Sequence, residues 1–192
     1  MTLPLKLRTA ASVPGIDALA AWLNEQGEPF EVDPPSTFEL RAIPVQLTRT
    51  EDGATAHITL TPSANLTRLL RLVFDLSDYL GADVHHAGSP IGRSQLWLTL
   101  AEDQDRLRIG AALDRAAAQN QRDDVLNGLW TLLSTLGLGR DLRWDATQTR
   151  VVEVIEDPNG SADTDLTQAP DDPTLHIIAW RWLAETWPSL AD

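Results

Sequence analysis

Asp83, His85 and His86 lie within four positions of one another and form the densest group of potential metal ligands in this 192-residue sequence. Carboxylate and imidazole groups bind zinc, and a catalytic zinc site uses three protein ligands. In an extended segment Asp83 and His85 point to one face and His86 points to the other. At most two of them converge on one ion, unless the fold adds His57 or His176. We therefore predict no metal site; a hydrogen-bonded or surface histidine pair is the default interpretation.

A glycine-containing loop, Gly88 to Arg93, follows this group. A phosphate-binding P-loop requires the full G-x-x-x-x-G-K-[ST] pattern between a strand and a helix. No lysine follows Gly92, and residues 95–100 are predicted to form a strand instead of a helix. The sequence also lacks the G-x-S-x-G pattern that holds a nucleophilic serine. We predict that the chain is not an enzyme and binds no cofactor.

Tryptophan is over-represented, with seven residues against three phenylalanines and one tyrosine. Tryptophan is enriched at protein interfaces because it combines a large apolar area with one hydrogen-bond donor. In the predicted strand 95–100, Leu96 and Leu98 face the core. Trp97 and Thr99 then face the opposite side of the sheet. That side is covered either by a second layer of the same domain or by another molecule.

The C-terminal segment, residues 174–187, is predicted to be a helix that is apolar on most sides. Such a helix must be covered, either by its own domain or by a second chain. Together with the strand, this helix supplies the predicted partner-binding residues, which are Trp97, Thr99, Trp180, Trp182 and Trp187.

The elements that position these residues follow from hydrophobic periodicity. Helices are predicted from Ile16 to Gly27, from a Ser63 cap through Leu66–Leu80 to Gly81, and over residues 102–118, 121–136 and 174–187. Strands are predicted at Phe30–Val32, along Phe38–Thr48 with a change of phase at Pro44, at 56–60, around Val84, at 95–100 and at 151–155. The predicted fold class is α+β, a twisted antiparallel sheet flanked by helices with a C-terminal helical extension.

Three regions are predicted along the chain. Residues 1–155 form the α+β domain, residues 156–173 form an acidic flexible linker, and residues 174–192 contain the tryptophan-rich helix. The linker holds six acidic residues, three prolines and no basic residue. Such a composition does not bury enough apolar surface to fold by itself.

The composition is acidic, with 28 Asp and Glu against 15 Lys and Arg and a net charge of −13. This charge repels nucleic acids and anionic membranes and favours a basic protein partner. The competing interpretation is that the acidity only keeps the protein in solution. The absence of cysteine and of a long apolar segment leads us to expect a cytoplasmic protein.

The predicted order over residues 15–118, helix, strands, long helix, two strands and helix, resembles the YbjN-like family and the type III secretion chaperones. The matching passages are Ile16–Leu23 before Gly27, the helix Leu66–Leu80, and Ser94–Leu100 leading into Leu107–Ala117. The resemblance implies a homodimer that holds a partner protein without ATP or covalent chemistry.

We therefore predict a non-enzymatic protein-binding module, chaperone-like or adaptor, which binds a basic partner through its sheet face. The first alternative is an acidic regulator of a DNA-binding protein, or a phosphate mimic. The lesser alternative is a metal-dependent enzyme that uses Asp83, His85 and His86.

Overall fold

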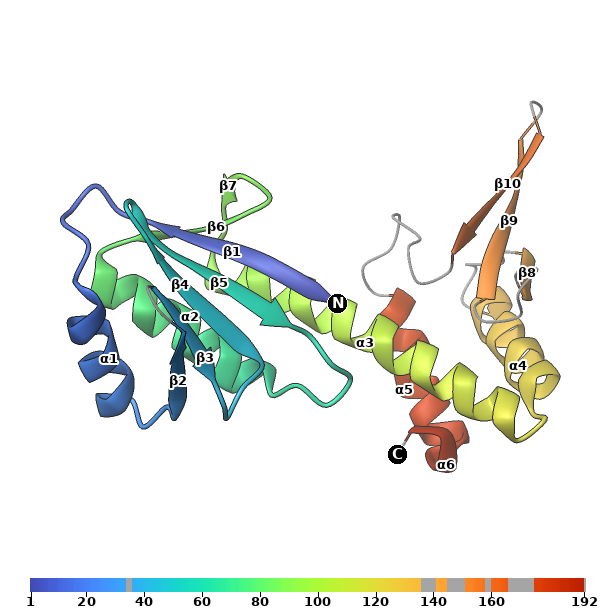
Figure 1. Cartoon of the computed structure of the whole chain (residues 1–192). Helices are drawn as coiled ribbons and strands as arrows, with labels where there is room; N and C mark the ends of the chain where they lie inside the picture. Colours follow the sequence, from blue (N-terminus) through green and yellow to red (C-terminus); the bar gives the residue numbers. More distant parts are fainter. Residues whose placement is uncertain (34–35, 136–140, 145–150, 158–159, 166–174, 192) are drawn as a thin grey trace. The chain divides into compact units, whose positions relative to one another are not determined.

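The computed structural model describes residues 1–33, 36–135, 141–144, 151–157, 160–165 and 175–191 (Figure 1). The chain forms two compact units, Met1–Ala101 and Glu102–Asp192. Their boundary falls inside helix α3, Arg93–Ala118, whereas the sequence placed the end of the first domain at residue 155. The first turns of α3 bury Leu96 and Leu100, and its later turns contribute to a second hydrophobic cluster.

The first unit is built on a seven-stranded antiparallel sheet of order β2-β3-β4-β5-β1-β6-β7. Its strands are β1 (Thr2–Arg8), β2 (Phe30–Asp33), β3 (Thr37–Leu40), β4 (Val45–Thr50), β5 (Gly53–Thr59), β6 (Asp83–His86) and β7 (Ser89–Pro90). At one edge lies β2, with exposed Glu31 and Asp33, and at the other lies β7, which is only two residues long. A mixed α and β fold with an antiparallel sheet is thus confirmed.

Sequence analysis did not identify β1, which occupies an inner position between β5 and β6. Leu3, Leu5 and Leu7 are buried and alternate with exposed residues, the pattern of a strand with one covered face. Pro4 argues against an inner strand because proline donates no ladder hydrogen bond. In the structure Pro4 lies beyond the pairing with β6, which begins at Leu5.

The predicted single strand from Phe38 to Thr48 was wrong. The segment forms two strands, β3 and β4, which pair antiparallel with Phe38 opposite Leu47. The chain reverses between them, and the Val45 amide donates to the Ile43 carbonyl at 2.8 Å across Pro44. The fixed φ of proline suits such a three-residue turn. The change of phase at Pro44 therefore marked a reversal of the chain.

Helices α1 (Ile16–Glu25) and α2 (Leu66–Leu80) were both predicted and are confirmed. They lie on one face of the sheet (Figure 1), and Leu19, Leu23 and Leu76 line a small internal gap with Phe38 and Leu47. The N-cap of α2 is Asn65 rather than the predicted Ser63. The Asn65 side chain accepts a hydrogen bond from the Arg68 amide at 3.0 Å. Gly81, with φ of 56°, ends the helix as predicted.

The prediction of a strand at residues 95–100 was also wrong, because these residues form the first turns of α3. Leu96 and Leu100 are buried, whereas Leu98 is 54% exposed. Burial of residues four positions apart is typical of a helix, while a strand would also have buried Leu98. A strand and a helix both predict burial of Leu96 and Leu100. Only the exposure of Leu98 distinguishes the helix from the strand.

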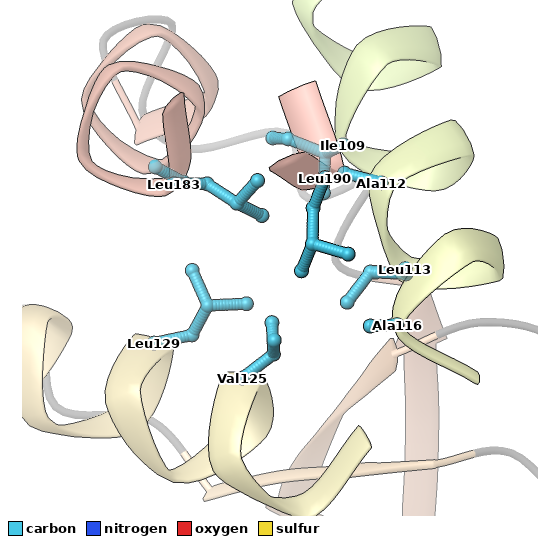
Figure 2. Close-up of a cluster of buried hydrophobic side chains, with 9 residues drawn as sticks. Ile109, Ala112, Leu113, Ala116, Val125, Leu129, Leu183 and Leu190 are labelled. Carbon is cyan, nitrogen blue, oxygen red and sulfur yellow. The ribbon is translucent and has the colours of Figure 1, made fainter. Parts of the chain in front are cut away.

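The second unit contains the later turns of α3, α4 (Arg122–Thr135), α5 (Leu175–Thr186) and α6 (Pro188–Ala191). The helices predicted at 121–136 and 174–187 match α4 and α5 to within a residue at each end. The helix predicted at 102–118 ends at the expected residue but begins nine residues earlier, at Arg93. Figure 2 shows side chains from all four helices pointing toward one another. This cluster consists of Ile109, Ala112, Leu113, Ala116, Val125, Leu129, Ala179, Leu183 and Leu190.

A three-stranded antiparallel sheet of order β10-β9-β8 completes this unit. Its strands are β8 (Asp141–Trp144), β9 (Val151–Asp157) and β10 (Gly160–Asp165). β9 contains the predicted strand 151–155, and β10 lies within the segment predicted to be a linker. Residues 158–159 and 166–173 of that segment lie outside the described residues. In the described ranges, no helix has the length and hydropathy required to span a membrane.

Gly53, the first residue of β5, provides a test of the seven-stranded sheet of the first unit. Its φ is 147°, and a Cβ at this position would collide with the carbonyl oxygen of Leu7 in β1. Gly53→Ala should lower the free energy of unfolding by about 3 kcal/mol, because it adds backbone strain to a backbone clash. Gly92→Ala is the matched control, since nothing lies within 4 Å of the position that its methyl group would take. Its cost should be at most about 1 kcal/mol; urea denaturation giving equal costs would contradict this arrangement.

Candidate functional site

A groove of about 580 Å³ lies between α2 and the first turns of α3, within the first unit. The residues that line the groove are spaced along the chain as on helix faces. On α2 they lie at i, i+3 and i+4 from Thr67, and on α3 at i, i+1, i+4 and i+5 from Arg93. Each wall is therefore one face of one helix. The lining residues are Thr67, Leu70 and Arg71 of α2, with Arg93, Ser94, Trp97 and Leu98 of α3.

The apolar part of the groove consists of Trp97, Leu98 and Leu70. Trp97 is 42% exposed and Leu98 is 54% exposed, although both are large hydrophobic residues, and Leu70 is buried. Adjacent exposed apolar side chains in a concave surface are typical of a binding site for another molecule. The prediction that Trp97 points away from the core agrees with its exposure, but its position on a helix differs from the predicted strand.

The rim of the groove is basic. Arg71 and Arg93 are exposed, and no carboxylate is among the residues that line this groove. The Arg93 guanidinium lies 5.2 Å from the centroid of the Phe74 ring, a cation–π contact that ties the start of α3 to α2. Arg71 Nε is 3.4 Å from Asp75 Oδ2, and 76% of the Arg71 side chain is exposed. Such an exposed pair is weak, so Arg71 is free to contact a ligand.

A second, polar hollow of about 480 Å³ lies on the other side of Thr67 and Arg71, which line both. Here Arg68 donates two hydrogen bonds of 2.9 Å to the buried carboxylate of Glu28. This two-point ion pair satisfies the carboxylate and ties the segment that follows α1 to α2. We interpret it as a structural support of the groove wall.

The structure places Asp83, His85 and His86 on β6, an extended segment as predicted. His86 is opposite buried Leu5 and lies on the helix-covered face, whereas Asp83 and His85 lie on the other face. His85 is opposite Lys6 in the pairing of β6 with β1. Among the side chains that the structure describes, no three His, Cys, Asp or Glu residues are placed to hold a metal ion.

The loop after β6 is a hairpin turn followed by a helix. Ala87 and Gly88 have φ of 49° and 86°, and His86 is opposite Ser89. Two consecutive positive φ values are typical of the type I′ turn that joins two antiparallel strands. The predicted strand after this loop was wrong, because α3 begins at Arg93. The lysine of a P-loop is still missing from the sequence.

Of the other predicted partner-binding residues, Trp180, Trp182 and Trp187 are partly buried against the hydrophobic cluster of the second unit. The Trp182 and Trp187 rings pack edge to face at 5.1 Å, and the Arg108 guanidinium lies 5.7 Å from the Trp180 ring centroid. The C-terminal helix is thus covered by its own chain. Thr99 donates to the Gln95 carbonyl at 3.0 Å in its own helix and does not line the groove.

The face of the first sheet opposite α1 and α2 is polar rather than apolar. It presents Lys6, Gln46, Thr55, His57 and His85, all of which are exposed or half-buried. The sheet face through which sequence analysis predicted partner binding is therefore polar. Sequence analysis missed the groove residues Leu70, Arg71, Arg93 and Leu98. A helical interpretation of residues 93–98 would have placed Arg93 and Leu98 on one face with Trp97, whereas Leu70 and Arg71 come from α2.

Comparisons of the chain with protein-family models, with curated proteins and with solved structures found no match.

Asp105, on α3 in the second unit, is a buried carboxyl with a raised pKa. Burial raises its pKa from the ordinary value of 3.8, and the opposing contribution comes from Arg108, whose Nη1 donates to Asp105 Oδ1 at 3.0 Å. The carboxyl is held by an arginine one helical turn away. We interpret it as part of the packing of this unit rather than as a proton donor for catalysis.

This raised pKa predicts a pH dependence of stability. Above pH 3.8 and up to the raised pKa, the folded chain retains a proton that the unfolded chain has lost, so the free energy of unfolding falls as pH rises. Asp105→Asn should remove the part of this decrease in the free energy of unfolding that comes from Asp105. Urea denaturation of the wild type and the variant across the acidic range measures it. Asp114→Asn, exposed on the same helix, should keep the wild-type profile, and parallel profiles for wild type and Asp105→Asn would contradict the assignment.

Proposed function

We propose that this chain is a non-enzymatic protein-binding module, chaperone-like or adaptor, that holds an apolar segment of a partner protein in the groove between α2 and α3. The observation that supports this function is the exposure of Trp97 and Leu98, side by side, in a groove of about 580 Å³. Tryptophan in a concave apolar setting is the residue type that contributes most to protein interfaces.

The size of the apolar surface indicates what kind of complex to expect. Covering one partly exposed indole and one leucine contributes roughly 2 to 4 kcal/mol at about 25 cal/mol per Å². This is less than the cost of bringing two molecules together, so flanking contacts must add to it. We infer a reversible complex whose lifetime depends on Trp97 as its central contact.

The arrangement of the titratable side chains also favours binding over catalysis. Glu28 is held by Arg68, and Asp105 is held by Arg108. Both carboxylates are thus engaged by a structural neighbour, and neither they nor His85 line the apolar groove. The two alternatives, a regulator of a DNA-binding protein and a metal-dependent enzyme, remain predictions without a specific observation in their favour.

Partner capture tests the proposal. Trp97→Lys should abolish recovery of the partner from the native lysate, because it places a charge in the apolar groove, while Trp130→Lys should retain it. Trp130 is the matched control, since it is 49% exposed on α4 and outside the groove. Both variants should keep the circular dichroism spectrum of the wild type. Equal recovery by the two variants would show that the groove is not the binding surface.

We also propose a homodimer, as the resemblance to YbjN-like proteins and type III secretion chaperones implies, and a cytoplasmic location, as expected from the absence of cysteine and of a long apolar segment. Light scattering should then give about twice the chain mass of 21.1 kDa at concentrations where the protein is fully associated. A mass of one chain over the whole accessible concentration range would rule out this assembly. The Trp97→Lys variant should keep the wild-type mass if the dimer uses a surface other than the groove.

A further inference from the structure

We propose that the groove binds an amphipathic helix of the partner protein, with carboxylates placed beside its apolar stripe. The inference rests on the proposed protein-binding function and adds the chemistry of the partner. It follows from the shape of the groove, from its charge and from the helix ends that meet there.

The shape favours a helix over an extended segment. Both walls are helices, so the groove offers no strand edge with which an extended peptide could pair its backbone. A helix satisfies its own backbone hydrogen bonds and presents apolar residues at i, i+3 and i+4. From Arg93 to Leu98, α3 rises by roughly 8 Å, which corresponds to one and a half turns of a bound helix.

The charge favours an acidic helix. Arg71 and Arg93 line the groove, and no Asp or Glu is among its lining residues. The groove is therefore locally basic on a chain whose net charge is −13. A helix with Lys or Arg beside its apolar stripe would face these two guanidinium groups, whereas Glu or Asp would pair with them.

The ends of the wall helices strengthen this preference. Thr67 is the second residue of α2, and Arg93 and Ser94 are the first two residues of α3. Both helices thus bring their N-terminal turns, and with them the positive end of the helix dipole, to the groove. The dipoles add to the two arginines and attract carboxylates.

The same charge disfavours a second copy of this chain as the occupant. A two-fold contact of groove on groove would bring Arg71 and Arg93 of one protomer against the same residues of the other. The occupant is therefore a different protein, and any homodimer uses another surface.

The test is selection from a displayed library of amphipathic helices of about 16 residues, with a fixed leucine stripe and flanking positions randomised among Glu, Gln and Lys. Selection on the wild type, compared with Trp97→Lys, should enrich Glu at the flanking positions. The affinity of a selected peptide, measured by fluorescence anisotropy, should fall about tenfold in the double variant Arg71→Gln and Arg93→Gln. Arg41→Gln, exposed on the same unit and outside the groove, should leave it unchanged.

Each other outcome is informative. Enrichment of Lys, or an affinity that does not fall as salt is raised, would overturn the acidic helix and leave the protein-binding function standing. If the wild type selects no helical peptides beyond those that Trp97→Lys selects, the inference of a bound helix is overturned. The protein-binding function is overturned only if Trp97→Lys and Trp130→Lys recover the partner equally in the capture experiment. A dimer that Trp97→Lys dissociates would identify a second copy as the occupant. The salt dependence of the peptide affinity is measured on the wild-type protein alone. It therefore tests the acidic character of the bound helix even if the double variant does not fold.

Discussion

The pairing of β1 with both β5 and β6 is the interaction on which the first unit depends. β6 is joined to the rest of the sheet through β1, and the α3 wall of the groove follows β6 and β7 along the chain. Thr2 is opposite Thr59, and Leu5 is opposite His86, so the N-terminal strand closes loops of more than fifty residues. Such non-local pairings carry an entropic cost that must be met before the two walls of the groove can form.

The charge of the molecule and the charge of its candidate site have opposite signs. The chain carries a net charge of −13, while the groove is lined by Arg71 and Arg93 and by no Asp or Glu. Arg93 is also held on Phe74, so one of the two cations is positioned before any ligand arrives. Composition averages over the whole chain, so it does not reveal that one surface carries two arginines and no carboxylate in its lining.

Much of the fold could be predicted from the sequence where the periodicity was unambiguous. The Leu66–Leu80 stripe and the Gly81 end specify α2, and the apolar faces of the later helices do the same. Prediction failed where one residue had two meanings: Pro44 turns the chain instead of bulging it, Pro4 occurs in an inner strand, and Leu98 is exposed. The site was only partly predictable. Trp97 was identified from its type, but its neighbours Leu70 and Arg71 are brought to it by tertiary packing.

The two edges of the main sheet also affect how the protein behaves at high concentration. β7 spans two residues and includes Pro90, which has no amide hydrogen to donate, while β2 carries Glu31 and Asp33 beside Val32. A long, flat, uncharged edge is a template for fibril growth, and short or charged edges suppress it. Neither border of this sheet is therefore a good template for adding further strands, although the same unit exposes an apolar groove.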